Sequence, residues 1–200
     1  MLEQGNLDII KERLTVPSVI EDLLEATGYM PSDMKYALHE VINDFQPDAA
    51  LLCIALSIKA LLEYQPYKSN SLKIMAMECD RLIADYAPLW LEHLNEENID
   101  PTLLFDTLSA LPEDLENISD LILLNVDFIR DTDPKAAEIL DILEIQASAQ
   151  AIIAEQYVDV MEESEGEEED DILPFAAAPA QSPVAYNDNV IPFPGSGVRS

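Results

Sequence analysis

Two histidines and two cysteines are the residues of this chain best suited to metal or nucleophilic chemistry. His93 and Glu96 are three residues apart, a spacing that can place two metal ligands on one helix face. Helical di-iron proteins, however, use paired Glu-x-x-His elements with further glutamates from facing helices. Here the order is reversed and the element is not repeated, so we interpret His93 as a surface residue. His39 shares a helix side with Lys35 and Asn43, which predicts that it is exposed.

The cysteines do not form a recognisable reactive motif. Cys53 and Cys79 lie within apolar patterns of helical period and lack a second partner at metal-ligand or redox spacing. Ser57, on the same apolar segment as Cys53, has no histidine near it in sequence. We therefore predict two buried, unreactive thiols and no catalytic nucleophile.

Loops that bind calcium or phosphate are not indicated either. The run Asp131-Thr132-Asp133 resembles the opening of a calcium loop, but Lys135 takes the fifth position and no glycine follows at the sixth. We interpret the run as a turn with a helix cap. The five glycines are not grouped to cradle a phosphate before a helix. The sequence thus predicts a protein that is not an enzyme and holds no cofactor and no metal.

The chain is strongly acidic throughout. Its formal net charge is −30, and residues 1–161 alone carry 31 Asp and Glu against nine Lys and Arg. Residues 92–161 hold 17 of those acids and only two of the bases. Such a field repels nucleic-acid phosphate and anionic lipid and favours encounter with basic surfaces. We expect a protein partner with a basic surface, no direct nucleic-acid binding and no membrane association.

The longest apolar run, Ala49–Leu62, is a poor candidate for a membrane span. Ser57 and Lys59 interrupt it, and it is shorter than the roughly 20 residues that cross a bilayer. It is apolar on nearly all sides, which predicts a central helix around which others pack. Residues 1–8 contain no basic stretch followed by an apolar run, so the expected location is cytoplasmic.

Proline marks where the expected helices start, because a proline in the first turn loses no hydrogen bond. The prolines in question are Pro17, Pro31, Pro47, Pro66, Pro88, Pro101, Pro112 and Pro134. Ser18 and Glu21 have capping-box spacing, with Gly28 as the stop of that helix, and Ser32 can cap the next one. Asp100-Pro101 and Asp133-Pro134 each place an N-cap acceptor before a proline. With no strand-like alternation, residues 1–161 are predicted to be an all-α, irregular bundle of about seven to eight helices.

The apolar faces indicate how deeply each expected helix is buried. One stripe comprises Met34, Ala37, Leu38, Val41, Ile42 and Phe45, and another comprises Leu72, Met75, Ala76, Cys79, Leu82, Ile83 and Tyr86. Residues 89–95 and 102–111 are expected to be short helices, and 113–130 and 134–161 the longest. In the last of these, Gln146, Ala149 and Gln150 interrupt the stripe, which makes its middle too polar for a deep core. We expect it to be a peripheral helix, or one whose end projects or meets a partner.

The composition changes at Glu162. Residues 162–171 contain eight acids in ten positions, and residues 172–200 are rich in Ala, Pro, Ser, Asn and Gly. Charge repulsion and the lack of buryable surface predict a disordered tail over 162–200. Two hydrophobic tips lie in it. They are Ile172, Leu173, Pro174 and Phe175, and Val190, Ile191, Pro192 and Phe193.

The first tip, with the acids before it, resembles the acidic C-terminal tip of bacterial single-stranded-DNA-binding proteins. There a run of aspartates ends in Ile-Pro-Phe and docks into basic-rimmed hydrophobic pockets of genome-maintenance enzymes. The resemblance covers about nine residues and departs in two ways, because Leu173 is inserted and Phe175 is internal. It implies a mode of binding in which acid steers and Pro-Phe anchors. The eight tip residues are therefore our predicted partner-binding residues.

Three functions are compatible with these observations. The first, which we favour, is a non-enzymatic interaction protein, an adaptor, chaperone or regulator, that binds partners through a helical body and the tail tips. The second is a nucleic-acid mimic that blocks a DNA-binding protein with its carboxylates. The third is a helical enzyme whose site is assembled from residues distant in sequence.

Overall fold

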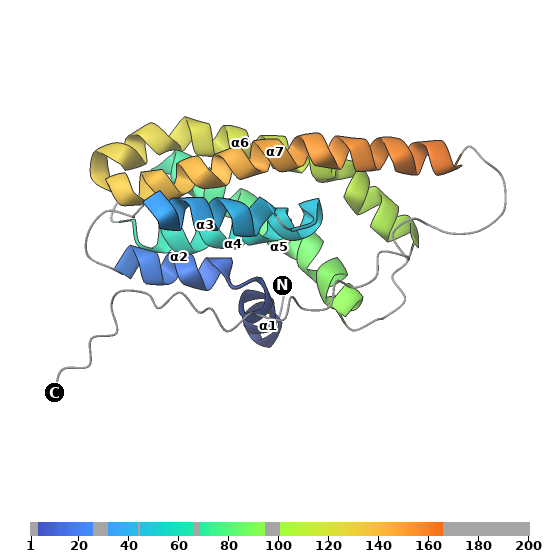
Figure 1. Ribbon diagram of the computed structural model, residues 1–200, viewed down its shortest axis with the longest axis horizontal. Helices are drawn as coiled ribbons and strands as arrows, with labels where there is room; N and C mark the ends of the chain where they lie inside the picture. Colours follow the sequence, from blue (N-terminus) through green and yellow to red (C-terminus); the bar gives the residue numbers. More distant parts are fainter. Residues whose placement is uncertain (1–3, 26–31, 44, 66–68, 95–100, 166–200) are drawn as a thin grey trace. The chain divides into compact units, whose positions relative to one another are not determined.

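The computed structural model is all-α over the residues it describes, which are 4–25, 32–43, 45–65, 69–94 and 101–165. These ranges contain seven helices and no strand, which confirms the predicted multi-helix bundle. The helices are α1 (Gln4–Leu14), α2 (Val16–Glu25), α3 (Ser32–Asn43), α4 (Pro47–Glu63), α5 (Asn70–Leu94), α6 (Pro101–Thr132) and α7 (Pro134–Glu165). Figure 1 shows their arrangement. The predicted tail lies outside the described residues beyond Glu165, and α7 itself extends past the expected end at Met161.

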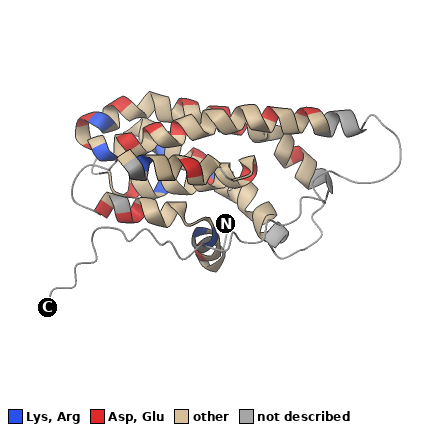
Figure 2. Ribbon diagram, viewed as in Figure 1, with Lys and Arg blue, Asp and Glu red and all other residues tan. Residues whose placement is uncertain are grey.

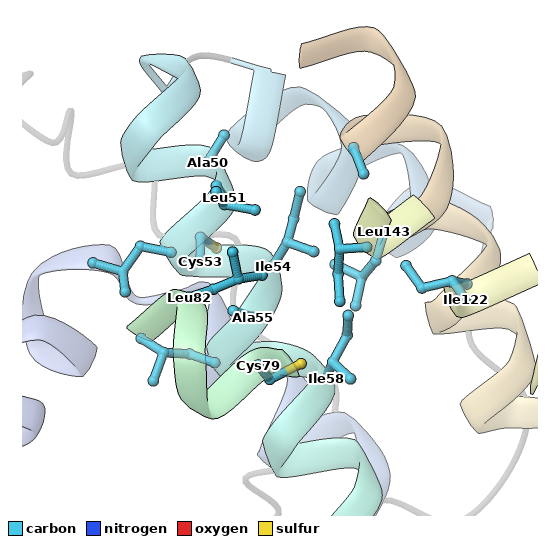
Figure 3. Packing of buried hydrophobic residues seen from close by; sticks show 14 of the residues in the cluster. Ala50, Leu51, Cys53, Ile54, Ala55, Ile58, Cys79, Leu82, Ile122 and Leu143 are labelled. Carbon is cyan, nitrogen blue, oxygen red and sulfur yellow. The ribbon is translucent and has the colours of Figure 1, made fainter. Parts of the chain in front are cut away.

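The centre of the bundle is α4, as its apolar composition predicts. Fourteen of its residues are buried, on every side of the helix. It packs against α1, α2, α3, α5 and α6. Figure 3 shows Cys79 and Leu82 of α5, Ile122 of α6 and Leu143 of α7 gathered around it. Because α4 has no polar face, the other helices must surround it to remove its side chains from water.

Proline predicts helix starts correctly at four places and wrongly at two, and Pro17, the second residue of α2, is one of the four. Pro47, Pro101 and Pro134 are the first residues of α4, α6 and α7. Pro88 and Pro112 instead lie inside α5 and α6, so the predicted short helices 89–95 and 102–111 are parts of longer ones. The apolar stripe continues through each of these prolines, and its burial outweighs one lost backbone hydrogen bond and a local kink. Pro31 and Pro66 lie outside the described residues.

The start of α2 differs from the predicted capping box. The helix begins at Val16, so Ser18 is an exposed residue of its first turn rather than the N-cap. The preceding Thr15 has a φ of 57°, and its N–H donates to the carbonyl of Lys11 at 3.0 Å. This left-handed residue ends α1 and turns the chain into α2. Glu21 pairs with Lys11 at 2.8 Å instead of capping the helix. The predicted stop, Gly28, lies outside the described residues.

The buried face of α3 is rotated from the predicted stripe. Leu38 and Ile42 are buried, but Ala37 is exposed and Val41 is 42 % exposed. The neighbouring positions Lys35 and His39 are instead half-buried against α7. The stripe predicted for α5 is confirmed, with six of its seven residues buried and Ala76 partly so.

The two longest helices, α6 and α7, run alongside each other in opposite directions (Figure 1). Ser119 of α6 donates a hydrogen bond to Glu144 of α7 at 3.1 Å, and Arg130 pairs with Asp141 at 2.8 Å. The turn between the helices carries the predicted cap, because Asp133 Oδ1 accepts the N–H of Ala136 at 3.1 Å.

We expect Asp133→Ala to lower the free energy of unfolding by about 1 kcal/mol, the usual cost of removing an N-cap side chain. Asp131→Ala is the matched control, because Asp131 is an exposed carboxylate at the end of α6 with no capping bond. Urea denaturation of the three proteins compares them. Equal loss of stability in both variants would show that charge rather than capping is responsible.

Candidate interaction surface

The described residues include the nucleophile candidates of the sequence, Cys53, Ser57 and Cys79. No three His, Cys, Asp or Glu residues of the described set are grouped as metal ligands. Cys53 and Cys79 are free and buried, as predicted, and burial raises the pKa of each thiol to about 12. The Ser57 hydroxyl donates to the Cys53 carbonyl oxygen at 2.7 Å, a bond within the helix. At neutral pH both thiols are therefore protonated and shielded. The side chains of His93 and Glu96 lie outside the described set.

His39 is half-buried, which corrects the prediction that it is exposed. The Gln146 amide Nε2 is hydrogen-bonded to its Nδ1. Lys35, one turn earlier on α3, pairs with Glu138 of α7 at 3.0 Å. These two contacts join α3 to α7 through polar groups.

Gln146 and Gln150 correct the expectation that the middle of α7 is too polar for a core. Both are fully buried, beside the buried Ala147, Ala151 and Ala154. The alanines are small, which lets neighbouring helices approach and cover the glutamines. Neither amide atom of Gln150 has a hydrogen-bond partner among the described residues, nor does Oε1 of Gln146. Burying an amide without partners costs stability.

Most of the cations in the described body are bound to carboxylates of the same body. Arg81 contacts Glu78, Asp85 and Asp114, and Arg130 contacts Asp127 and Asp141. Lys11, Lys35 and Lys59 each pair with one carboxylate as well. Five of the nine lysines and arginines of residues 1–161 are thus engaged internally. Figure 2 shows the result, with Asp and Glu along the helices and Lys or Arg at few places.

One of these ion pairs reaches into the core. Asp114 of α6 is buried, and it accepts hydrogen bonds from Arg81 and from the hydroxyl of Tyr86 at 2.9 Å. Burial first, and then the Asp114 charge, raises the pKa of Tyr86. The hydrogen bonds that Arg81 donates to the Glu78 carboxylate are the largest contribution that raises the pKa of Arg81. This cluster fixes α5 against α6 and leaves no cation free at their junction.

Exposed carboxylates outside these ion pairs occur on several of the described helices, α6 among them. Glu113, Glu116, Asp120 and Asp131 are exposed and form no ion pair with any described lysine or arginine. Asp127 is exposed too, and it contacts Arg130 at 2.8 Å. The arrangement can attract a cationic surface from outside, because little internal positive charge offsets it.

Apolar side chains are exposed on the same helix. Leu124 is 74 % exposed and Phe128 is 45 % exposed, and Leu123, which precedes Leu124, is exposed as well. The apolar period of α6 did not predict these exposed residues, because a helical apolar period indicates the buried face of a helix. Their signal was present in the run of five apolar residues from Leu121 to Val126 broken only by Asn125, which cannot all face one side of a helix.

The tip residues predicted to bind a partner lie outside the described residues, so the structure places none of them. They are Ile172, Leu173, Pro174, Phe175, Val190, Ile191, Pro192 and Phe193. Their assignment stays a prediction.

Comparison with known proteins adds no relative to this description: no family model, no curated protein and no solved structure matches the chain. Among the described helices, none is both long enough and apolar enough to cross a membrane.

We expect Gln150→Met to raise the free energy of unfolding by about 1 kcal/mol, because methionine fills a similar volume without an unpaired amide. Gln146→Met is the control, since it removes a comparable amide but also breaks the hydrogen bond to His39. Its gain should be smaller or absent. Thermal and urea denaturation measure both. Destabilisation by Gln150→Met would show that the amide is satisfied in solution.

Proposed function

We propose that this chain is a non-enzymatic interaction protein, an adaptor or regulator, that binds a protein partner with a basic surface. The observation that carries the proposal is the imbalance of charge on the body. Glu113, Glu116, Asp120 and Asp131 of α6 are exposed and take part in none of the ion pairs of the described lysines and arginines, while Arg81 and Arg130 are held by carboxylates of the chain itself. An uncompensated acidic surface accelerates encounter with cationic proteins and disfavours anionic ones.

The inert interior supports the non-enzymatic part of the proposal. The buried polar groups join helices to one another, as His39 does with Gln146 and Arg81 does with Asp114. The buried thiols are protonated at neutral pH. A cytoplasmic location belongs to the same proposal, because two free cysteines suit a reducing compartment.

The tail tips would provide a second contact with the partner. Each tip joins an extended Pro backbone to a phenylalanine, which is a large apolar anchor of modest entropic cost. Two tips on one chain raise the local concentration of the second once the first is bound. The body steers a basic partner by charge, and the tips hold it.

Affinity capture tests this function. The bait proteins are the full chain, a chain ending at Met161, and the double variant Phe175→Ala/Phe193→Ala, exposed to a lysate of the source cells. We expect the full chain to retain basic proteins, the two altered baits to retain much less of them, and all capture to fall as salt rises. Salt shortens the Debye length to about 10 Å near 0.1 M, which weakens exposed charge attraction.

Tyr186→Ala is the matched control for the tips, because it removes an aromatic ring from the same tail outside both of them. It should capture as the parent does, and melting curves of the body should be the same for all tail variants. If the amount of captured protein changes neither with salt nor with the tip substitutions, the proposal is contradicted. Displacement of a captured DNA-binding protein by duplex DNA would instead identify a nucleic-acid mimic.

A further inference from the structure

The outer face of α6 carries an apolar seam with the spacing of a coiled-coil contact. Leu121, Leu124 and Phe128 are separated by three and four residues, so they lie in one row along the helix. Leu121 is partly buried against the core, while Leu124 and Phe128 are 74 % and 45 % exposed. The row is distinct from the buried face of α6, which presents Ile118, Ile122, Val126 and Ile129 to the interior.

Polar residues continue the seam at both ends. Asn117 lies four residues before Leu121, Asp131 lies three residues after Phe128, and both are exposed. From Asn117 to Asp131 the row is about 20 Å long at the rise of an α-helix. Three to four turns of a second helix would cover a row of that length, which is an ordinary helix in a globular protein.

Acidic residues flank this seam. Asp120 and Asp127 each lie one residue ahead of a seam position and seven residues from each other, so they form a parallel row on one side. Both are exposed, as is Glu113 nearer the start of the helix. Charged residues in such a flanking row pair with opposite charges on the partner helix in coiled coils.

The carboxylates beside the seam favour a basic partner over a second copy of this chain. A second copy of this chain would bring Asp120 and Asp127 against the same carboxylates, under a net charge of −30 on each molecule. Like charges in facing positions oppose association. We infer that the seam Leu121–Leu124–Phe128 is the docking site for an amphipathic helix of a basic protein, with an apolar stripe flanked by lysine or arginine. This inference rests on the proposed function and assigns it a site.

Two synthetic peptides of about 20 residues, long enough to be helical alone, test the seam. The striped peptide has leucine at alternating three- and four-residue spacing with lysine and alanine elsewhere, and the scrambled peptide has the same composition without a stripe. Fluorescence anisotropy measures their binding to the full chain at low and physiological salt. We expect the striped peptide to bind more tightly than the scrambled one.

Substitutions then locate the site. Leu124→Gln/Phe128→Gln should weaken the striped peptide by about tenfold or more, and Asp120→Asn/Asp127→Asn should weaken it and reduce its salt dependence. Ile152→Gln is the control, because Ile152 is 61 % exposed but lies on α7. It should change nothing. Melting temperatures should stay within a few degrees of the parent's, since every altered side chain is exposed and the Asp127–Arg130 ion pair lies at the surface.

The outcomes distinguish failure of the docking site on the seam from failure of the proposed function. If both peptides bind in a salt-dependent way and the Leu124/Phe128 variant binds as the parent does, the seam is refuted and basic-partner binding stands. If neither peptide binds at low salt, the proposed function fails together with the seam. A parent chain that is dimeric by light scattering, and monomeric as the Leu124/Phe128 variant, would show that a second copy occupies the seam and would overturn the inference.

Discussion

The burial of α4 is the constraint on which the rest of this molecule depends. A helix with buried side chains on every side cannot be stable at the edge of a domain, so neighbours must pack around its whole circumference. Helices α1, α2, α3, α5 and α6 contact it, and Leu143 of α7 contributes to the same core. Each of the five helices that contact α4 buries one face against it. Their outer faces are left free to carry charge.

That division explains how a strongly acidic chain folds. Carboxylates that would be costly in the interior are placed on outer faces, and Asp114, the buried carboxylate among the described residues, is satisfied by Arg81 and Tyr86. The glutamines of α7 are less well satisfied, since Gln150 is buried without a described partner. Most of the described lysines and arginines of the body thus form ion pairs within the body, and the excess of carboxylates is exposed to solvent. The same surface bears the apolar seam of α6.

Sequence predicted the parts of this fold that follow from apolar period. The all-α class, the central position of 49–62, the buried thiols and the cap at Asp133 all follow from residue types and their spacing. Proline was a weaker guide, because tertiary burial carried α5 and α6 through Pro88 and Pro112. The rotation of α3 and the burial of Gln146 depend on contacts between α3 and α7, which are distant in sequence, so no local pattern could reveal them. The predicted tip residues lie outside the described chain, whereas the seam on α6 was visible in sequence as an excess of apolar residues.

Hydrogen exchange of the native protein, resolved by helix, tests the central place of α4 most directly. If every other helix is held by packing on α4, the amides of Ala49–Leu62 can exchange only when the whole domain unfolds. Their protection should therefore be the highest in the chain and should equal the global free energy of unfolding from urea denaturation. Exchange of α4 amides at a lower free energy than those of α5 or α6 would contradict the account, because the bundle would then survive without its central helix.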